Sequence, residues 1–89
     1  MLEDTKTIAQ CIDTLSTIIG DVSVPKNIKR SAEGMKKILS NEKEPLLERT
    51  ASVISELENV GNERNIPFHT RTMIWGLSSQ LERISVGKD

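Results

Sequence analysis

The sequence predicts an all-α fold, a four-helix up-and-down bundle built from a duplicated helical hairpin. Three observations carry this prediction. Apolar residues recur with helical spacing in four segments, no segment alternates with the period of two that marks a strand, and each proline stands just ahead of an apolar stripe. The 89 residues are enough for one small domain, so we expect a single helical domain over residues 1–89.

The four predicted helices lie near residues 4–20, 24–40, 45–60 and 66–86. In each segment the apolar side chains follow one another at intervals of three or four residues, which gathers them on one face of a helix. In order along the chain, the stripes contain Ile8, Cys11, Ile12, Leu15, Ile18, Ile19 and Val22; Ile28, Ala32, Met35, Ile38 and Leu39; Leu46, Leu47, Val53, Ile54, Leu57 and Val60; and Met73, Ile74, Leu77, Leu81 and Ile84.

Prolines mark the starts of the last three predicted helices. Pro25, Pro45 and Pro67 are expected in the first helical turns, where the missing backbone N–H costs nothing. Ser23 and Asn65 each stand two residues before a proline and belong to the residue types that favour helix N-caps. We therefore expect their side chains to accept the first free backbone N–H groups.

The chain repeats itself at a spacing of 42 residues, which predicts two hairpins over about 4–40 and 45–86. The matched pairs are Ala9 and Ala51, Ile12 and Ile54, Leu15 and Leu57, Ile18 and Val60, Val24 and Ile66, Pro25 and Pro67, Gly34 and Gly76, and Leu39 and Leu81. Tandem helical repeats of the HEAT type have a similar period, so two HEAT-like repeats are the alternative. We favour the closed bundle because two repeats are too few to bury a continuous solenoid core.

Two of the repeated residues have no evident role. Gly34 and Gly76 occupy matched positions inside predicted helices, where each costs about 1 kcal/mol relative to alanine. A close approach of another backbone would explain them, but the helical wheel places both away from the core. The sequence gives no physical reason for them.

Composition excludes several classes of protein. Apolar residues make up 36% of the chain and charged residues 28%, and the net charge of −1 gives no general attraction to nucleic acid or anionic membranes. No apolar run is long enough to span a membrane. The N-terminal "MLEDTKTIAQ" has no basic stretch followed by an apolar one, so we expect no signal peptide. A single cysteine cannot form an internal disulfide, which indicates a cytoplasmic protein.

Three stretches resemble a known family. "DVSVPKNIKR", "LSNEKEP" and "NIPFHTRTMIW" are similar to the uncharacterised protein family 0147, a set of short archaeal proteins, and the resemblance runs over almost the whole chain. "VPKNIKR" and "HTRTMIW" carry most of its specificity. The resemblance implies a compact all-α protein of the archaeal cytoplasm. It implies no activity, so it assigns no functional residue.

The residues that carry chemistry do not form a catalytic pattern. His69 is the only histidine, and Cys11 is the only cysteine and lies on an apolar stripe, which is typical of an inert thiol. Metal sites need several ligands at set spacings, and none are grouped that way. The glutamates lie in predicted loops or on polar faces, without the burial that separates catalytic pKa values. We therefore expect no enzyme, no cofactor and no metal.

One predicted helix has a basic face opposite its apolar stripe. Its cations are Lys26, Lys29, Arg30, Lys36 and Lys37. A nucleic-acid-binding protein would use such a face to follow phosphates. The alternative is a solvated face, paired with the acidic loop Glu42–Glu44 or with the third helix.

The bundle topology suggests a narrower anion site. In an up-and-down arrangement the second and fourth helices begin at the same end of the molecule. That end would hold Lys26, Lys29, His69 and Arg71 together with two sets of free backbone N–H groups. Helix N-termini attract anions, so phosphate or sulfate is a candidate ligand there.

An aromatic flank distinguishes the fourth helix from its twin. Phe68 and Trp75 are seven residues apart and fall together, off the core direction. Arg71 and Glu82 lie on the same flank, and Arg71 is able to stack on Trp75. Either this flank widens the core within the chain, or it meets another chain, since aromatics and arginine favour interface cores. The sequence therefore predicts a non-enzymatic interaction module that binds a second copy of itself or another protein. Nucleic-acid or phosphate binding by the basic face is the alternative.

Overall fold

The computed structural model describes the backbone of residues 2–86 and the side chains of residues 4–84. Four helices form it: α1 (Leu2–Ile19), α2 (Lys26–Ser40), α3 (Leu46–Gly61) and α4 (Phe68–Val86). No described residue belongs to a strand, so the all-α prediction is confirmed. The observed bounds differ from the predicted ones by at most two residues, the ordinary uncertainty of a helix end.

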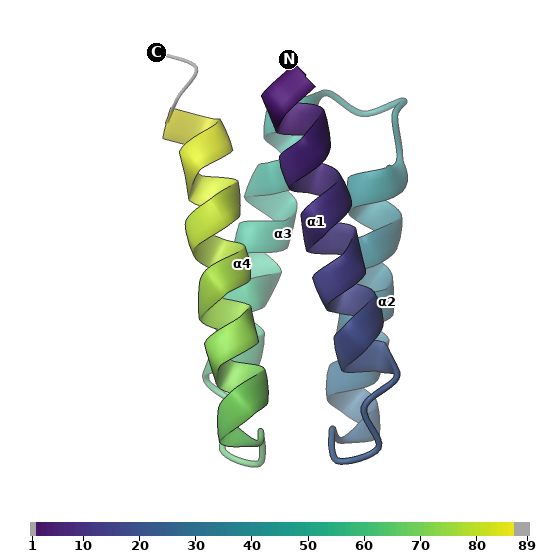
Figure 1. Cartoon of the computed structure of the whole chain (residues 1–89), viewed down its shortest axis with the longest axis vertical. Helices are drawn as coiled ribbons and strands as arrows, with labels where there is room; N and C mark the ends of the chain where they lie inside the picture. The colour runs from purple at the N-terminus through teal and green to yellow at the C-terminus, as the bar shows by residue number, and fades with distance from the viewer. Residues whose placement is uncertain (1, 87–89) are drawn as a thin grey trace.

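The helices run alternately up and down, and each packs against two others (Figure 1). α1 contacts α2 and α4, and α3 contacts the same two helices, whereas the diagonal pairs α1–α3 and α2–α4 do not touch within the described part of the chain. Stacked HEAT-like repeats would bring those diagonal pairs together, so the contacts favour a closed arrangement. The α1–α2 and α3–α4 turns lie at one end, as Figure 1 shows, and the α2–α3 turn lies at the other.

The core is aliphatic and is drawn from all four helices. Its buried apolar residues are Cys11, Leu15, Ile18, Val24, Ile28, Ala32, Met35, Leu39, Val53, Leu57, Val60, Ile66, Ile74, Leu77, Leu81 and Ile84. The chain's two aromatic residues are absent from it. Burying a leucine or isoleucine side chain contributes roughly 1.5–3 kcal/mol, so this set supplies the main driving force for folding. None of the described helices is both long and apolar enough to cross a bilayer.

Burial follows the repeat of 42 residues. In every one of the eight matched pairs the two residues have the same degree of exposure. Leu15 and Leu57 are both buried, as are Val24 and Ile66 in the turns ahead of α2 and α4. The two hairpins therefore present equivalent faces to a shared core, which is what a duplicated hairpin predicts.

The prolines stand one residue ahead of the helices. The carbonyl of Pro25 accepts the first helical bonds, from the N–H groups of Ile28 and Lys29, both at 3.1 Å. The predicted caps are wrong, because α2 begins three residues after Ser23 and Pro25 holds the N-cap position. The Ser23 hydroxyl donates instead to Asp21 Oδ1 at 2.7 Å. Asn65 likewise stands three residues ahead of α4, too far upstream to be its N-cap.

An arginine fastens the α2–α3 turn. Arg49 Nη1 donates to the carbonyl of Leu39 in the last turn of α2 at 2.8 Å, and its Nε donates to the carbonyl of Glu44 at 3.0 Å. The last carbonyls of a helix have no partner within the helix, and they carry the negative end of its dipole. The guanidinium satisfies one of them and fixes the direction in which α3 leaves the turn.

Candidate interaction surfaces

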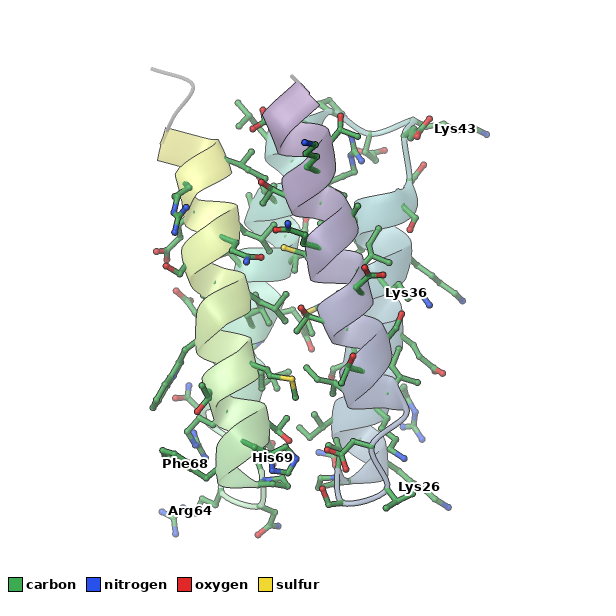
Figure 2. All side chains as sticks on the ribbon, viewed as in Figure 1. Lys26, Lys36, Lys43, Arg64, Phe68 and His69 are labelled. Carbon is green, nitrogen blue, oxygen red and sulfur yellow. The ribbon has the colours of Figure 1, made fainter. Side chains whose placement is uncertain are left out.

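The aromatic flank of α4 is exposed in the folded chain. Phe68 is 77% exposed and Trp75 is 56% exposed, although such side chains bury 150–250 Å² each in typical cores. In Figure 2, Phe68 projects away from the other helices. A wider core within the chain, one of the two alternatives drawn from the sequence, is therefore wrong. These residues are two turns apart on one side of the helix.

The exposed positions of α4 around these aromatics carry little charge up to Ser79, whereas Glu82 and Arg83 are exposed further along α4 and Glu58 of α3 lines the groove beside Trp75. Between residues 68 and 79, the exposed positions of α4 are Phe68, His69, Thr72, Trp75, Gly76 and Ser79. The imidazole of His69 is the one titratable group among them. We define Phe68, Thr72, Trp75, Gly76 and Ser79 as the α4 face. Depletion of charge together with exposed aromatics is the composition that marks the centre of a protein interface.

Arg71 lies beside the α4 face, but its guanidinium is bonded to backbone carbonyls of the α3–α4 turn. It is half-buried, its Nη1 donates to the carbonyl of Gly61 at the end of α3, and its Nη2 donates to the carbonyl of Glu63 at 2.7 Å. The guanidinium thus fastens the α3–α4 turn as Arg49 fastens the α2–α3 turn. The structure gives Arg71 this positioning role. It fixes the first turn of α4, from which Phe68 projects.

A groove runs beside Trp75 between α3 and α4. Its volume is about 390 Å³. The residues that line it are Leu57, Glu58, Gly61, Asn62, Ile74, Trp75 and Ser78. Because Gly61 has no side chain and a Cβ there would meet nothing within 4 Å, the end of α3 leaves one side of the groove open. An incoming side chain could pack against Trp75 there, next to the α4 face.

A second groove, at the opposite end, is larger. Its volume is about 610 Å³, and it lies where α1, the end of α2 and the start of α3 meet. Ile8, Ile12 and Leu46 are half-buried on it, and Arg49 closes one side. The guanidinium of Arg49 already donates to two backbone carbonyls. The polar residues that line this groove besides Arg49 are Asp4, Thr5, Ser40 and Glu42.

At the shared end of α2 and α4, His69 meets a carboxylate. His69 Nε2 lies 2.6 Å from Asp21 Oδ2, and Figure 2 shows the ring turned towards the α1–α2 turn. Asp21 also accepts from the hydroxyl and the N–H of Ser23, at 2.7 and 2.9 Å. These bonds, the Ser23 hydroxyl first and His69 next, hold the pKa of the Asp21 carboxyl well below its usual range.

The Asp21–His69 pair argues against the predicted anion site. Lys26 and His69 do lie at one end of the molecule, as the topology predicted (Figure 2). His69, however, already faces an internal anion, and Arg71 is bonded to backbone carbonyls. A phosphate there would meet the Asp21 carboxylate, which repels it. The sequence reasoning missed Asp21. Its signal was the Asp-x-Ser spacing of an Asx turn after α1.

The basic face of α2 is solvated. Lys26, Arg30 and Lys37 are exposed, and Lys29 and Lys36 are half-buried. Lys26 and Lys36 project outward in Figure 2. Over the side chains of residues 4–84 the single ion pair is Asp21–His69, so the expected pairing of these cations with the acidic loop is not seen. We keep the name α2 basic face for these five residues.

The buried thiol has a structural partner. Cys11 is fully buried, and its Sγ donates to Oε1 of Gln80 at 3.2 Å, which joins α1 to α4. Burial raises the pKa of the Cys11 thiol to about 11, so the thiol stays protonated near neutral pH. Within the described side chains, no group of three or more histidine, cysteine or acidic residues is placed to hold a metal ion.

The chain is similar to known archaeal proteins over nearly its whole length. The family model of the uncharacterised protein family UPF0147 matches residues 1–84. The chain belongs to this family. A UPF0147 protein of Methanosarcina mazei is 52% identical over 84 residues, covering 94% of this chain and 90% of its own. A UPF0147 protein of Archaeoglobus fulgidus is 48% identical, covering 91% of this chain and 92% of its own.

Two solved structures share the fold. A crystal structure of a UPF0147 protein from Thermoplasma acidophilum superposes with a TM-score of 0.90 at 34% identity, over 96% of this chain and 100% of that one. The crystal structure of a protein of unknown function, MMP1188, superposes with a TM-score of 0.83 at 37% identity, over 88% and 89% of the two chains. The resemblance noted from the motifs is therefore confirmed. UPF0147 carries no assigned function, so membership fixes the fold and leaves the activity open.

Proposed function

We propose that this UPF0147 protein is a small, non-enzymatic interaction module that associates with a second copy of itself through the α4 face. One observation carries the proposal. Phe68 and Trp75, the chain's two aromatic residues, lie exposed together on a charge-poor face, while the core is built without them. We also infer a cytoplasmic location, which the single unpaired cysteine supports.

The charge of the α4 face favours a second copy as the partner. A twofold dimer places the same surface on both sides of its interface, so a charge in the centre would face a like charge and be repelled. The α2 basic face would repel its copy, whereas the α4 face holds no charged side chain. The groove beside Trp75 then offers each copy a place for an aromatic side chain of the other.

The available area limits the strength of a dimer. Taken over its Cα atoms, the molecule measures 36 × 21 × 18 Å, so even its whole broadest side covers roughly 750 Å². The α4 face is a fraction of that side and lies below the roughly 800 Å² per partner of a standard interface. Two aromatic anchors in the centre of such an interface are the residue types that dominate binding energy. We therefore expect micromolar rather than picomolar association.

The test is the molar mass in solution as a function of concentration, measured by light scattering. The wild-type mass should rise from that of one chain towards twice that value as concentration increases. Trp75→Ala should lose at least 2 kcal/mol of association free energy, roughly a 30-fold weaker dimer, because it removes an interface anchor.

Leu47→Ala supplies the matched control. Leu47 is an apolar residue of α3 that is 47% exposed, about as much as Trp75, and it lies outside the α4 face and the groove beside it. This variant should dimerise like the wild type. A wild-type mass of one chain at every concentration, or equal losses in the two variants, would refute the proposal.

A further inference from the structure

Charge is divided unevenly between α2 and the rest of the chain. Of the 12 lysines and arginines, α2 holds five, and of the 13 acidic residues it holds one, Glu33. Although the net charge of the chain is −1, α2 alone carries a charge of about +4 and the rest of the chain is acidic. At physiological ionic strength the Debye length is about 8 Å, so a ligand that lies along α2 responds mainly to the local positive charge.

The cations lie along one side of the helix, in two groups with Glu33 between them. Lys26, Arg30 and Lys37 are exposed, and Lys29 and Lys36 flank them one residue away. The twelve residues from Lys26 to Lys37 span about 16 Å along the helix, which equals the axial rise of about five base pairs of duplex. Several phosphates therefore lie within the length of this face.

The same face lacks what a protein partner would need. The exposed positions of α2 are Lys26, Asn27, Arg30, Glu33, Gly34, Lys37 and Ser40. No large apolar or aromatic side chain is among them, so the centre of a protein interface would have no anchor. Backbone recognition of nucleic acid needs no such anchor, because phosphate contacts supply the affinity. The absence of aromatics also excludes base stacking by this face.

We infer that the α2 basic face binds the phosphate backbone of nucleic acid without sequence preference. α2 and α4 are diagonal in the fold and make no contact, so this face and the α4 face can be occupied together. The inference therefore stands apart from self-association, and either can fail without the other.

The experiment is titration of a fluorescently labelled mixed-sequence DNA duplex of about 20 base pairs, read by anisotropy, at several salt concentrations. We expect a dissociation constant on the order of 10⁻⁶–10⁻⁴ M at physiological salt, and tighter binding at low salt. Three to five phosphate contacts give a slope of log K against log salt of about −2.7 to −4.5, so affinity should fall roughly 40- to 500-fold between about 50 and 200 mM salt.

Three single variants separate the α2 basic face from charge in general. Arg30→Ala should make the slope shallower by about 0.9, because it removes one phosphate contact. Arg83→Ala removes an exposed cation from α4, the diagonal helix, and should leave the slope unchanged. Glu33→Gln removes the acid from the middle of the face and should strengthen binding several-fold, a gain that misfolding cannot produce.

Three outcomes would overturn the inference. The first is no binding at low salt, and the second is equal weakening by Arg30→Ala and Arg83→Ala. The third is that polyglutamate displaces the labelled duplex as well as an unlabelled duplex does at equal charge, which would assign the face to an acidic protein.

Discussion

Replacing Gly34 or Gly76 with alanine tests how the monomer is built. Both glycines are exposed inside helices, and a Cβ at either position would meet no atom within 4 Å. Neither has a positive φ, so alanine fits the existing backbone without strain. A glycine in an exposed helix interior costs about 0.8–1 kcal/mol relative to alanine. The close backbone approach that might have explained these residues does not occur within the chain.

The expected magnitude follows directly. Each variant should gain about 1 kcal/mol in the free energy of unfolding, because the added methyl group lowers the entropy of the unfolded chain and introduces no clash. For a domain of this size that gain raises Tm by about 4–8 °C. The assay is urea unfolding followed by circular dichroism, with protein dilute enough that light scattering gives the mass of one chain.

The two positions control for each other. Gly34 and Gly76 occupy matched positions of the repeat, one in α2 and one in α4. The two gains in the free energy of unfolding should therefore agree within about 0.5 kcal/mol and add in the double variant. A loss of stability in either single variant of the monomer would refute the reasoning, because it would require a neighbour that the structure does not place there.

Three further substitutions test individual contacts. Thr70 is fully buried and its hydroxyl has no hydrogen-bond partner, so Thr70→Val should raise the free energy of unfolding by about 1 kcal/mol; a lower urea midpoint would count against this. The pKa of Asp21 is lowered on folding, so its contribution to stability is complete above the ordinary value of 3.8 and is lost as pH falls below it. Asp21→Asn should therefore weaken the loss of thermal stability between about pH 5 and pH 2, and an unchanged pH dependence would contradict the lowered pKa of Asp21. Arg71→Lys keeps the charge but cannot hold both carbonyls of the α3–α4 turn, so it should cost about 1 kcal/mol in urea unfolding; wild-type stability would disprove the fastening role.

The repeat explains why most of the core could be predicted from the sequence. Helical periodicity depends only on local spacing, and the shift of 42 residues checks one hairpin against the other. Leu15 and Leu57 could each be assigned to the core because each lies on an apolar stripe and matches the other across the repeat. The all-α class and the helix bounds followed from the same local signals.

Contacts between distant residues could not be predicted this way. Asp21 and His69 are 48 residues apart, and they meet because α1 packs beside α4 and the two turns share an end. Arg71 reaches back 10 residues to Gly61, a contact set by the path of the turn rather than by either helix. The Asp-x-Ser spacing predicts a turn at Asp21, but nothing in the sequence marks His69 as the partner of Asp21 or Gly61 as the partner of Arg71.

The exposure of Trp75 shows a different limit. A helical wheel gives the direction of a side chain relative to its own helix, but it does not give how far neighbouring helices reach around that helix. Trp75 lies off the core direction in both alternatives drawn from the sequence. Only the packing of α3 against α4 decides between them, and it leaves the indole on the surface beside a groove.

The emission of Trp75 tests the central claim most directly. The indole is the chain's only tryptophan, it is more than half exposed in the single chain, and it lies on the face proposed for self-association. We predict emission at short wavelength in concentrated protein that shifts to longer wavelength on dilution, with the same midpoint as the change in mass. Emission of an exposed indole at every concentration would contradict the account.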